Sequence, residues 1–183
     1  MQPRRGVIAI SAAVLTLVAA GGIAVGASSA GPRAAATAAG MTSFEAAIAE
    51  RINQVRRARG LRGLGMNRRL AAAADFHSTD MGKRGYFSHE SADGTPFWQR
   101  VRRWYAARGF RDWSVGENLI WGTDRYSAAF AVRRWMASAP HRRNILTRAW
   151  REIGVGAVFF ANAPGEYGGR AVTIVTADFG ARS

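Results

Sequence analysis

The sequence predicts an α+β domain in which helices come first along the chain and paired strands come last. Several segments between residues 42 and 140 carry apolar side chains at the three- and four-residue spacing of amphipathic helices. Three β-prone runs follow or interrupt them, at 113–121, 153–160 and 171–179. The last two are joined by a Gly/Pro/Asn-rich segment, 161–169, which is typical of an antiparallel hairpin. We therefore expect a small antiparallel sheet covered by helices.

The first two helices are each marked by a cap and an apolar face. Thr42, followed three residues later by Glu45, forms a capping-box pattern, and the helix that follows ends by Gly60. A second helix is expected from about Asn67 to residues 82–85. The expected inner faces are Phe44, Ile48, Ile52 and Val55 in the first helix and Leu70, Ala74, His77 and Met81 in the second.

Two further helices are bounded by proline, serine and glycine. Thr95 is predicted to cap a third helix with Pro96 at its first position, and Gly109 is predicted to end it. A fourth helix is expected to begin at Ser127 and to be broken by Pro140. The inward residues are predicted to be Phe97, Val101 and Trp104 in the third helix and Phe130, Val132, Trp135 and Met136 in the fourth.

Length and composition indicate one domain with an N-terminal appendage. The chain has 183 residues, of which 48% are hydrophobic and 21% charged, enough for one core but not for two. It contains no cysteine, which excludes disulfides, thiolate zinc sites, a cysteine nucleophile and a lipid-modified cysteine. The six tryptophans are predicted to fill the core, with a lipid or glycan groove as the alternative.

The chain is strongly basic, with a formal net charge of +14. Nearly all of its positive residues are arginines, Lys83 being the only lysine, and they are scattered along the sequence. An ordinary solvated surface is the simpler interpretation, and loose association with anionic envelope polymers or lipid headgroups is the alternative. No nucleic-acid recognition motif is present, so we expect no nucleic-acid partner.

The N-terminus has the order of a secretory signal. Arg4 and Arg5 precede an uncharged apolar stretch, 6–30, which ends in small residues just before Gly31. The stretch is also long enough to span a bilayer if it remains uncut. We expect export, with either cleavage or an N-terminal anchor.

These features divide the chain into a signal peptide or membrane anchor over 1–30, a low-complexity Ala/Thr/Gly linker over 31–41 and a folded domain over 42–183. Cleavage would place the mature N-terminus between about Gly31 and Met41. We therefore expect a secreted protein, or one anchored to the outer face of the cytoplasmic membrane through its N-terminal segment.

Several short motifs follow one another along the predicted domain. In order they are His77-Ser78-Thr79-Asp80-Met81, Phe87-Ser88-His89, Gly116-Glu117-Asn118-Leu119, Pro140-His141-Arg142, Glu152-Ile153-Gly154-Val155-Gly156 and Ala177-Asp178-Phe179-Gly180. Together, in this order and spacing, they resemble bacterial CAP (SCP-type) domains, a superfamily that also contains cysteine-rich secretory proteins, insect venom antigens and plant pathogenesis-related proteins. The resemblance spans residues 44–180 and implies an α-β-α sandwich.

The resemblance also implies a cleft lined by two histidines and two glutamates, which hold a divalent metal in some family members. Motif matching places three of these residues at His89, Glu117 and His141. The second glutamate would be expected on the helix that carries Trp135, but residues 125–151 contain no Asp or Glu. The cleft is therefore expected to be reduced to His, Glu and His.

Two interpretations of this residue set remain open. His89 and His141 could be metal ligands in an incomplete Zn²⁺ shell completed by water. A carboxylate beside a histidine can equally orient the ring with no metal, so no cofactor is required. Asn118 and Ser138 are expected to support the cleft, and His77, at helical spacing, is expected to face the core rather than act as a ligand.

Two functions follow from the resemblance and the residues. The first is a monomeric, non-enzymatic binding module whose partner is a lipid or an anionic cell-envelope component, since family relatives have been linked to sterol and lipid binding. The second is an extracellular peptidase with a histidine base, Glu117 as orienter, and Ser88, Ser91, Ser114 or a metal-bound water as nucleophile. No nucleophile-elbow sequence or H-E-x-x-H motif is present, so no catalytic residue is assigned.

Overall fold

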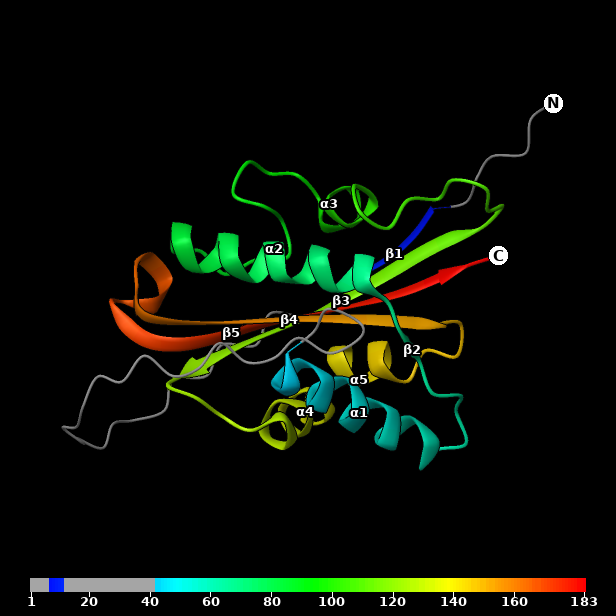
Figure 1. Cartoon of the computed structure of the whole chain (residues 1–183), viewed down its shortest axis with the longest axis horizontal. Coiled ribbons are helices and arrows are strands. Elements are labelled where there is room, and N and C mark those ends of the chain that lie inside the picture. Colours follow the sequence, from blue (N-terminus) through cyan, green and yellow to red (C-terminus); the bar gives the residue numbers. More distant parts are fainter. Residues whose placement is uncertain (1–6, 12–41) are drawn as a thin grey trace.

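The computed structural model describes residues 7–11 and 42–183, and it has three layers. Helices α2 and α3 cover one face of a central sheet, and α1, α4 and α5 cover the other (Figure 1). The α-β-α sandwich and the α+β class predicted from the sequence are therefore confirmed. Apart from residues 7–11, the predicted signal or anchor and the linker lie outside the described residues.

The sheet has five strands in the order β1-β3-β5-β4-β2. Their bounds are Val7–Ser11 for β1, Gly65–Met66 for β2, Trp113–Thr123 for β3, Glu152–Ala163 for β4 and Arg170–Arg182 for β5. The three central strands pair antiparallel, as predicted, but β1 on β3 and β2 on β4 are parallel, so the sheet is mixed. Sequence patterns missed these outer strands because β2 is two residues long and β1 falls within the predicted export segment.

The helices begin at the caps that the sequence indicated in three cases. The bounds are Ser43–Arg57 for α1, Arg68–Arg84 for α2, Phe97–Arg102 for α3, Ala128–Ala137 for α4 and Ala139–Ile145 for α5. Thr42 and Glu45 form the predicted capping box, Asn67 caps α2, and Ser127 caps α4. Among the described residues, no helix is long and apolar enough to cross a membrane.

The third helix is shorter than predicted and is not capped by Thr95. It ends at Arg102 instead of Gly109, and Pro96 occupies the N-cap position without a side-chain bond. The backbone N–H of Thr95 is held by Asp93 (2.9 Å), so this segment is part of a turn before the helix.

Helix α4 ends just before Pro140, as predicted, but a further helix that the sequence did not indicate begins there. Pro140 lies in the first turn of α5, where the missing N–H costs nothing, and it starts a new helix directly after α4. Ser138 is both the last cap of α4 and the first cap of α5. The change of direction at this residue brings His141 to the sheet.

Helix α2 lies directly on strand β4 because two glycines leave room for its backbone. A Cβ atom added to Gly154 would lie 2.0 Å from the backbone N of Ala71, and one added to Gly156 would lie 2.1 Å from that of Asp75. Both distances are far below van der Waals contact. This glycine pair therefore fixes the height of α2, and of His77 within it, above the sheet.

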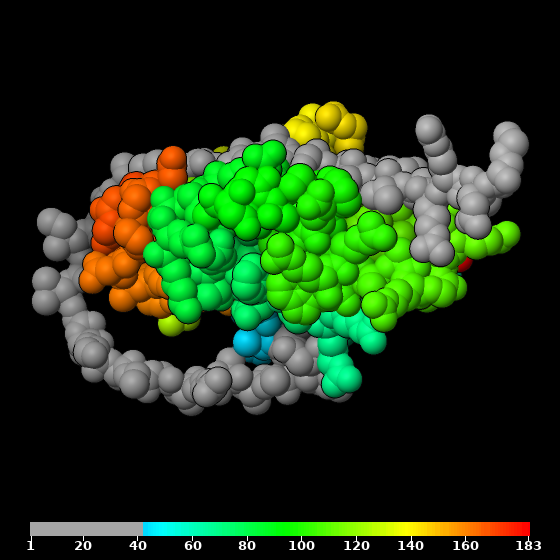
Figure 2. All heavy atoms as spheres, turned by 90° about the horizontal axis from the view of Figure 1, so that it is seen from above, coloured from blue at the N-terminus to red at the C-terminus, as the bar shows by residue number. Residues whose placement is uncertain are grey.

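The turn between β4 and β5, which contains a short 3₁₀ helix at Gly165–Tyr167, packs against the end of α2. Figure 2 looks onto α2 and α3 and shows this turn beside them. The N–H of Glu166 donates to the backbone carbonyl of Gly85 (2.9 Å). The hydroxyl of Tyr167 donates to the backbone carbonyl of Tyr86 (2.8 Å). The start of the loop that leads to His89 is thereby fixed.

The tryptophans mainly fill the core, as predicted. Trp113, Trp121, Trp135 and Trp150 are buried, whereas Trp98 and Trp104 are half-buried. The predicted inner face of α2 is fully buried as well, and it consists of Leu70, Ala74, His77 and Met81.

Candidate functional site

The candidate site is organised by strand β3, whose successive side chains alternate between the two faces of the sheet. Glu117 faces α2 and α3, where it meets Arg100, and Asn118 faces α5, where its amide donates to the backbone carbonyl of His141 (3.2 Å). Both Glu117 and Asn118 are fully buried. Side chains from both outer layers therefore meet at this point of the strand.

Glu117 is held by two partners, one on each carboxylate oxygen. Nδ1 of His89 lies 2.7 Å from Oε1, and the guanidinium of Arg100 forms an ion pair with Oε2. Burial alone would raise the pKa of the Glu117 carboxyl, but Arg100, together with His77 and His89, outweighs burial and lowers the pKa to about 2. Glu117 is therefore ionised at neutral pH.

Arg100 was not predicted as part of the site. It is fully buried in α3, and besides Glu117 it binds the carbonyl of His89 (2.9 Å) and the hydroxyl of Ser91 (3.3 Å). A signal was present in the sequence, because Arg100 lies three residues after Phe97, on the inward side of the helix. Its bonds tie the His89 loop to the sheet.

His77 is buried beside this ion pair rather than exposed in a cleft. Its Nε2 lies 2.9 Å from the carbonyl of Ser88, and its Nδ1 has no hydrogen-bond partner among the described residues. Burial is the largest influence on the ring and lowers its pKa to about 4. His77 is therefore neutral at physiological pH and contributes to the packing of α2, as its spacing predicts.

His141 approaches from α5, on the other side of the sheet. Its Nδ1 lies 2.7 Å from the hydroxyl of Ser138, and its Nε2 is buried without a partner in the described part of the chain. Burial and the nearby charge of His89 lower the pKa of His141 to about 4. Ser138 and Asn118 thus both contact His141.

Asp178 is a second buried carboxyl that the sequence did not assign to the site. It lies directly opposite Glu117 in the β3–β5 register and is fully buried. Neither of its oxygens has a hydrogen-bond partner within residues 42–183. Burial, and then the charge of Glu117, raise the pKa of Asp178 well above its ordinary value. Glu117 and Arg100 therefore supply one ionised carboxylate and one guanidinium, and ionisation of the neighbouring Asp178 is disfavoured.

A divalent metal does not fit this arrangement. Both oxygens of Glu117 are already bonded, and the guanidinium of Arg100 opposes a second cation. His89 and His141 each direct Nδ1 at a protein partner, which leaves only Nε2 of each ring as a potential metal ligand. Within the described residues, no three His, Asp or Glu side chains are placed so that they could hold a metal ion. Arg100 supplies the positive charge that Glu117 needs.

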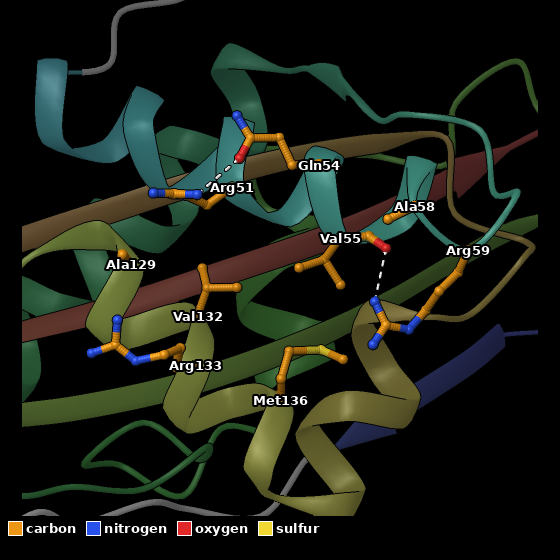
Figure 3. A pocket seen from close by; sticks show the side chains of 9 residues that line it. All are labelled: Arg51, Gln54, Val55, Ala58, Arg59, Ala129, Val132, Arg133 and Met136. Atoms are coloured by element: carbon orange, nitrogen blue, oxygen red, sulfur yellow. Dashed lines mark hydrogen bonds between the residues drawn. The ribbon is translucent and has the colours of Figure 1, made fainter.

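A different concavity lies between α1 and α4, on the opposite face of the sheet from α2. This α1–α4 groove has a volume of about 490 Å³. Its apolar lining consists of Val55, Ala58, Ala129, Val132 and Met136, and its polar lining consists of Arg51, Gln54, Arg59 and Arg133. Figure 3 shows these side chains around the space between the two helices. None of the described residues that line the groove is acidic.

The arginines of the α1–α4 groove are only weakly engaged by the protein. Arg51 bonds Gln54 (3.2 Å), and Arg59 bonds the carbonyl of its neighbour Val55 (3.1 Å), as drawn in Figure 3. None of the three arginines forms an ion pair with a described residue, and all three are exposed. The groove therefore combines an apolar floor with unneutralised positive charge.

Two proteins of Bacillus subtilis are similar in sequence. YkwD is 32% identical over 119 residues, which cover 64% of this chain and 44% of YkwD. The membrane protein YlbC is 30% identical over 116 residues, which cover 63% of this chain and 32% of YlbC. The matched region thus spans less than half the length of either relative.

Solved structures show the same fold. An extracellular protein containing an SCP domain from Bacillus anthracis matches with a TM-score of 0.57 and 26% identity, over 74% of this chain and 39% of that one. An outer surface protein of Borrelia burgdorferi matches with a TM-score of 0.56 and 18% identity, over 74% of this chain and 90% of that one. The latter likeness concerns the fold alone.

The family model described as the cysteine-rich secretory protein family, CAP, matches residues 49–179, which is most of the chain. This range contains the His89–Glu117 pair, Arg100 and His141. The chain therefore belongs to the cysteine-rich secretory protein (CAP) family.

Proposed function

We propose that the protein is an exported, monomeric, non-enzymatic binding module that takes an anionic lipid in the α1–α4 groove. The observation that carries the proposal is the combination of an apolar floor with three exposed arginines and no acidic side chain. An alkyl chain would cover the floor, and a carboxylate or phosphate headgroup would bind the guanidinium groups. Few other ligand classes match both the apolar floor and the positively charged rim of such a groove.

Export is supported by the basic and then apolar N-terminal sequence. Similar proteins from Bacillus anthracis and Borrelia burgdorferi are described as extracellular and outer surface proteins. We propose that this protein works outside the cytoplasmic membrane, either released after cleavage or held by its N-terminal segment. N-terminal sequencing of the exported protein tests this, with a start between about Gly31 and Met41 expected for the released form.

The peptidase alternative has less support because the required parts are divided between two histidines. The hydroxyl of Ser138 pairs with His141, but the other ring nitrogen of His141 has no carboxylate partner among the described residues. The carboxylate of Glu117 orients His89 instead. A Ser-His-acid triad needs all three groups in series.

Lipid binding is tested with a fluorescent sixteen-carbon fatty acid titrated into the full chain. Ala129→Trp should fill the α1–α4 groove and weaken binding about tenfold or more. Ala47→Trp, at an exposed position of α1 outside the groove, is the matched control and should bind like the wild type. Equal affinity for the two variants, or no saturable binding at all, would overturn the proposal.

The roles of metal and catalysis are tested separately. Calorimetry with Zn²⁺ should give the same heats for the wild type and for a His89→Ala, His141→Ala variant, because we propose that no metal is required. Digestion of a peptide library, with and without Zn²⁺, should leave every peptide intact. Cleavage that disappears in the histidine variant would replace the binding module with the peptidase.

A further inference from the structure

A second hollow lies between the start of α2 and the end of α3, on the face seen in Figure 2. It has a volume of about 610 Å³, and we call it the arginine hollow because four arginines line it: Arg69, Arg102, Arg103 and Arg108. The remaining lining consists of Trp104 and two alanines, so none of the described residues that line the hollow is acidic. The hollow is distinct from the α1–α4 groove and from the His89–Glu117 cluster.

The four guanidinium groups have no hydrogen-bond or ion-pair partner in the described part of the protein. None of them forms an ion pair or a side-chain hydrogen bond there, although elsewhere Arg57, Arg84, Arg100 and Arg182 are all paired with carboxylates. Like charges gathered around one concavity repel one another, and among the described residues the attraction of Asp93 for Arg103 offsets this only in part. A bound anion would offset the remaining repulsion between the arginines.

Arg69 lies at an unfavourable position for helix stability. It is in the first turn of α2, which contains no acidic residue, and the positive end of the helix dipole disfavours a cation there. The positive potential of the helix end therefore adds to that of the arginines. Stability of α2 does not explain this residue, whereas attraction of an anion does.

The wall of the hollow is partly aromatic. Trp104 lines it and packs on Phe76, whose exposed fraction is 43%, with ring centroids 5.0 Å apart. This pair gives the hollow one rigid side. Each of the four guanidinium groups can bind a phosphate through two hydrogen bonds. A hollow of this size therefore suits several linked phosphate groups better than a single small ion.

We propose that the arginine hollow binds a ligand that carries several phosphate groups. Such a ligand could be a soluble polyphosphorylated compound or polymer, or a cluster of phospholipid headgroups, and the two sources present the same chemistry to the guanidiniums. The site goes beyond the lipid groove, since it lies on the other face of the sheet and does not need an alkyl chain. Occupation of both sites would let one molecule bridge two anionic components.

The experiment is calorimetric titration of the full chain with inorganic tripolyphosphate at low and at physiological salt. A variant with Arg69→Gln, Arg102→Gln and Arg108→Gln should weaken saturable binding about tenfold or more. A charge-matched control with Arg62→Gln, Arg143→Gln and Arg148→Gln removes three exposed arginines outside the hollow and should weaken binding less than about threefold. Circular dichroism should show both variants folded.

Two outcomes would overturn the proposal. Equal weakening in the two triple variants would mean that net charge alone attracts the anion. Absence of saturable binding, or equal affinity for a polyglutamate of the same charge, would exclude a phosphate site.

Vesicles of phosphatidylglycerol distinguish the sources of phosphate. If headgroups occupy the hollow, tripolyphosphate displaces the wild type from vesicles, and the hollow variant no longer binds them. If the phosphates come from a soluble compound or polymer, vesicle binding survives in the hollow variant while tripolyphosphate binding is lost. The groove variant Ala129→Trp should bind tripolyphosphate like the wild type, so that failure of the lipid proposal leaves this one intact.

Discussion

Charged side chains are paired with one another in the His89–Glu117 cluster but, among the described residues, are unpaired in the α1–α4 groove. In the cluster, Glu117 and Arg100 are fully buried and satisfy each other, with His89 on the remaining carboxylate oxygen. In the groove, Arg51, Arg59 and Arg133 are exposed and unneutralised around an apolar floor. The comparison indicates that the family motif residues serve mainly to hold the loop, the strand and α5 together, whereas the groove is free to take a ligand.

The largest effect is expected when the positive charge of Arg100 is removed from the cluster. Arg100→Met should lower the free energy of unfolding by about 3–5 kcal/mol, because it leaves the carboxylate of Glu117 buried without a counter-charge. Urea denaturation measures the loss. The double variant Arg100→Met, Glu117→Gln should recover a large part of it, and a loss below about 1 kcal/mol in the single variant would show that the pair is not desolvated.

Acid should weaken the cluster through His77. Burial lowers the pKa of this histidine to about 4, so between pH 6.5 and pH 4 the unfolded chain binds a proton that the folded protein does not. The His77 share of the stability should therefore be full above about pH 6.5 and fall by about 3 kcal/mol as the pH approaches 4, and His141, whose pKa is also lowered to about 4, should add to the fall in the same window. The contribution of Glu117, whose pKa is lowered to about 2, should be lost only below about pH 4.5.

Denaturation curves at a series of pH values test this window. In a His77→Gln variant, which carries no titratable ring at this position, the free energy of unfolding should fall less between pH 6.5 and pH 4. The difference from the wild type should be the contribution of about 3 kcal/mol assigned to His77. An unchanged slope in that variant would mean that another group carries the pH dependence.

Replacing the second buried acid should have a smaller and opposite effect. Burial and the charge of Glu117 raise the pKa of Asp178, so ionisation of this carboxyl costs more in the folded protein than in the unfolded chain. Asp178→Asn removes that cost and keeps nearly the same side-chain shape. We expect the variant to be more stable by about 1 kcal/mol at pH 7 and equal to the wild type below about pH 3.8. A clear destabilisation at pH 7 would indicate that Asp178 is ionised.

The groove arginines should matter least for folding. A variant with Arg51→Gln, Arg59→Gln and Arg133→Gln should change the free energy of unfolding by less than about 0.5 kcal/mol, because these side chains are exposed. The same variant should bind the fluorescent fatty acid about tenfold more weakly. A variant that loses stability while keeping its affinity would reverse the roles assigned to the two regions.

Sequence patterns predicted most of the fold and part of the cluster. Capping residues such as Thr42 and Asn67 identified helix starts because the bonds involved are local. His89, Glu117 and His141 were found through motifs. The helix after Pro140 was missed because proline both ends helices and begins them.

What the sequence could not supply depends on distant segments. A buried arginine is rare, and the partner that makes Arg100 tolerable there, Glu117, lies on a strand of the sheet. Asp178 becomes unusual only through its register opposite Glu117. The α1–α4 groove depends on how far apart two helices pack, which no local pattern encodes.

The central claim is that the ligand enters the α1–α4 groove and leaves the His89–Glu117 cluster and the nearby His141 unchanged. It is tested most directly by an NMR titration of the full chain with a sixteen-carbon fatty acid, following the methyl groups of Val55, Val132 and Met136 and the rings of His89 and His141. Saturable shifts of the groove methyls with unmoved histidine rings are the predicted result. Shifts of the histidine rings at lower ligand concentration than those of the groove methyls would contradict it.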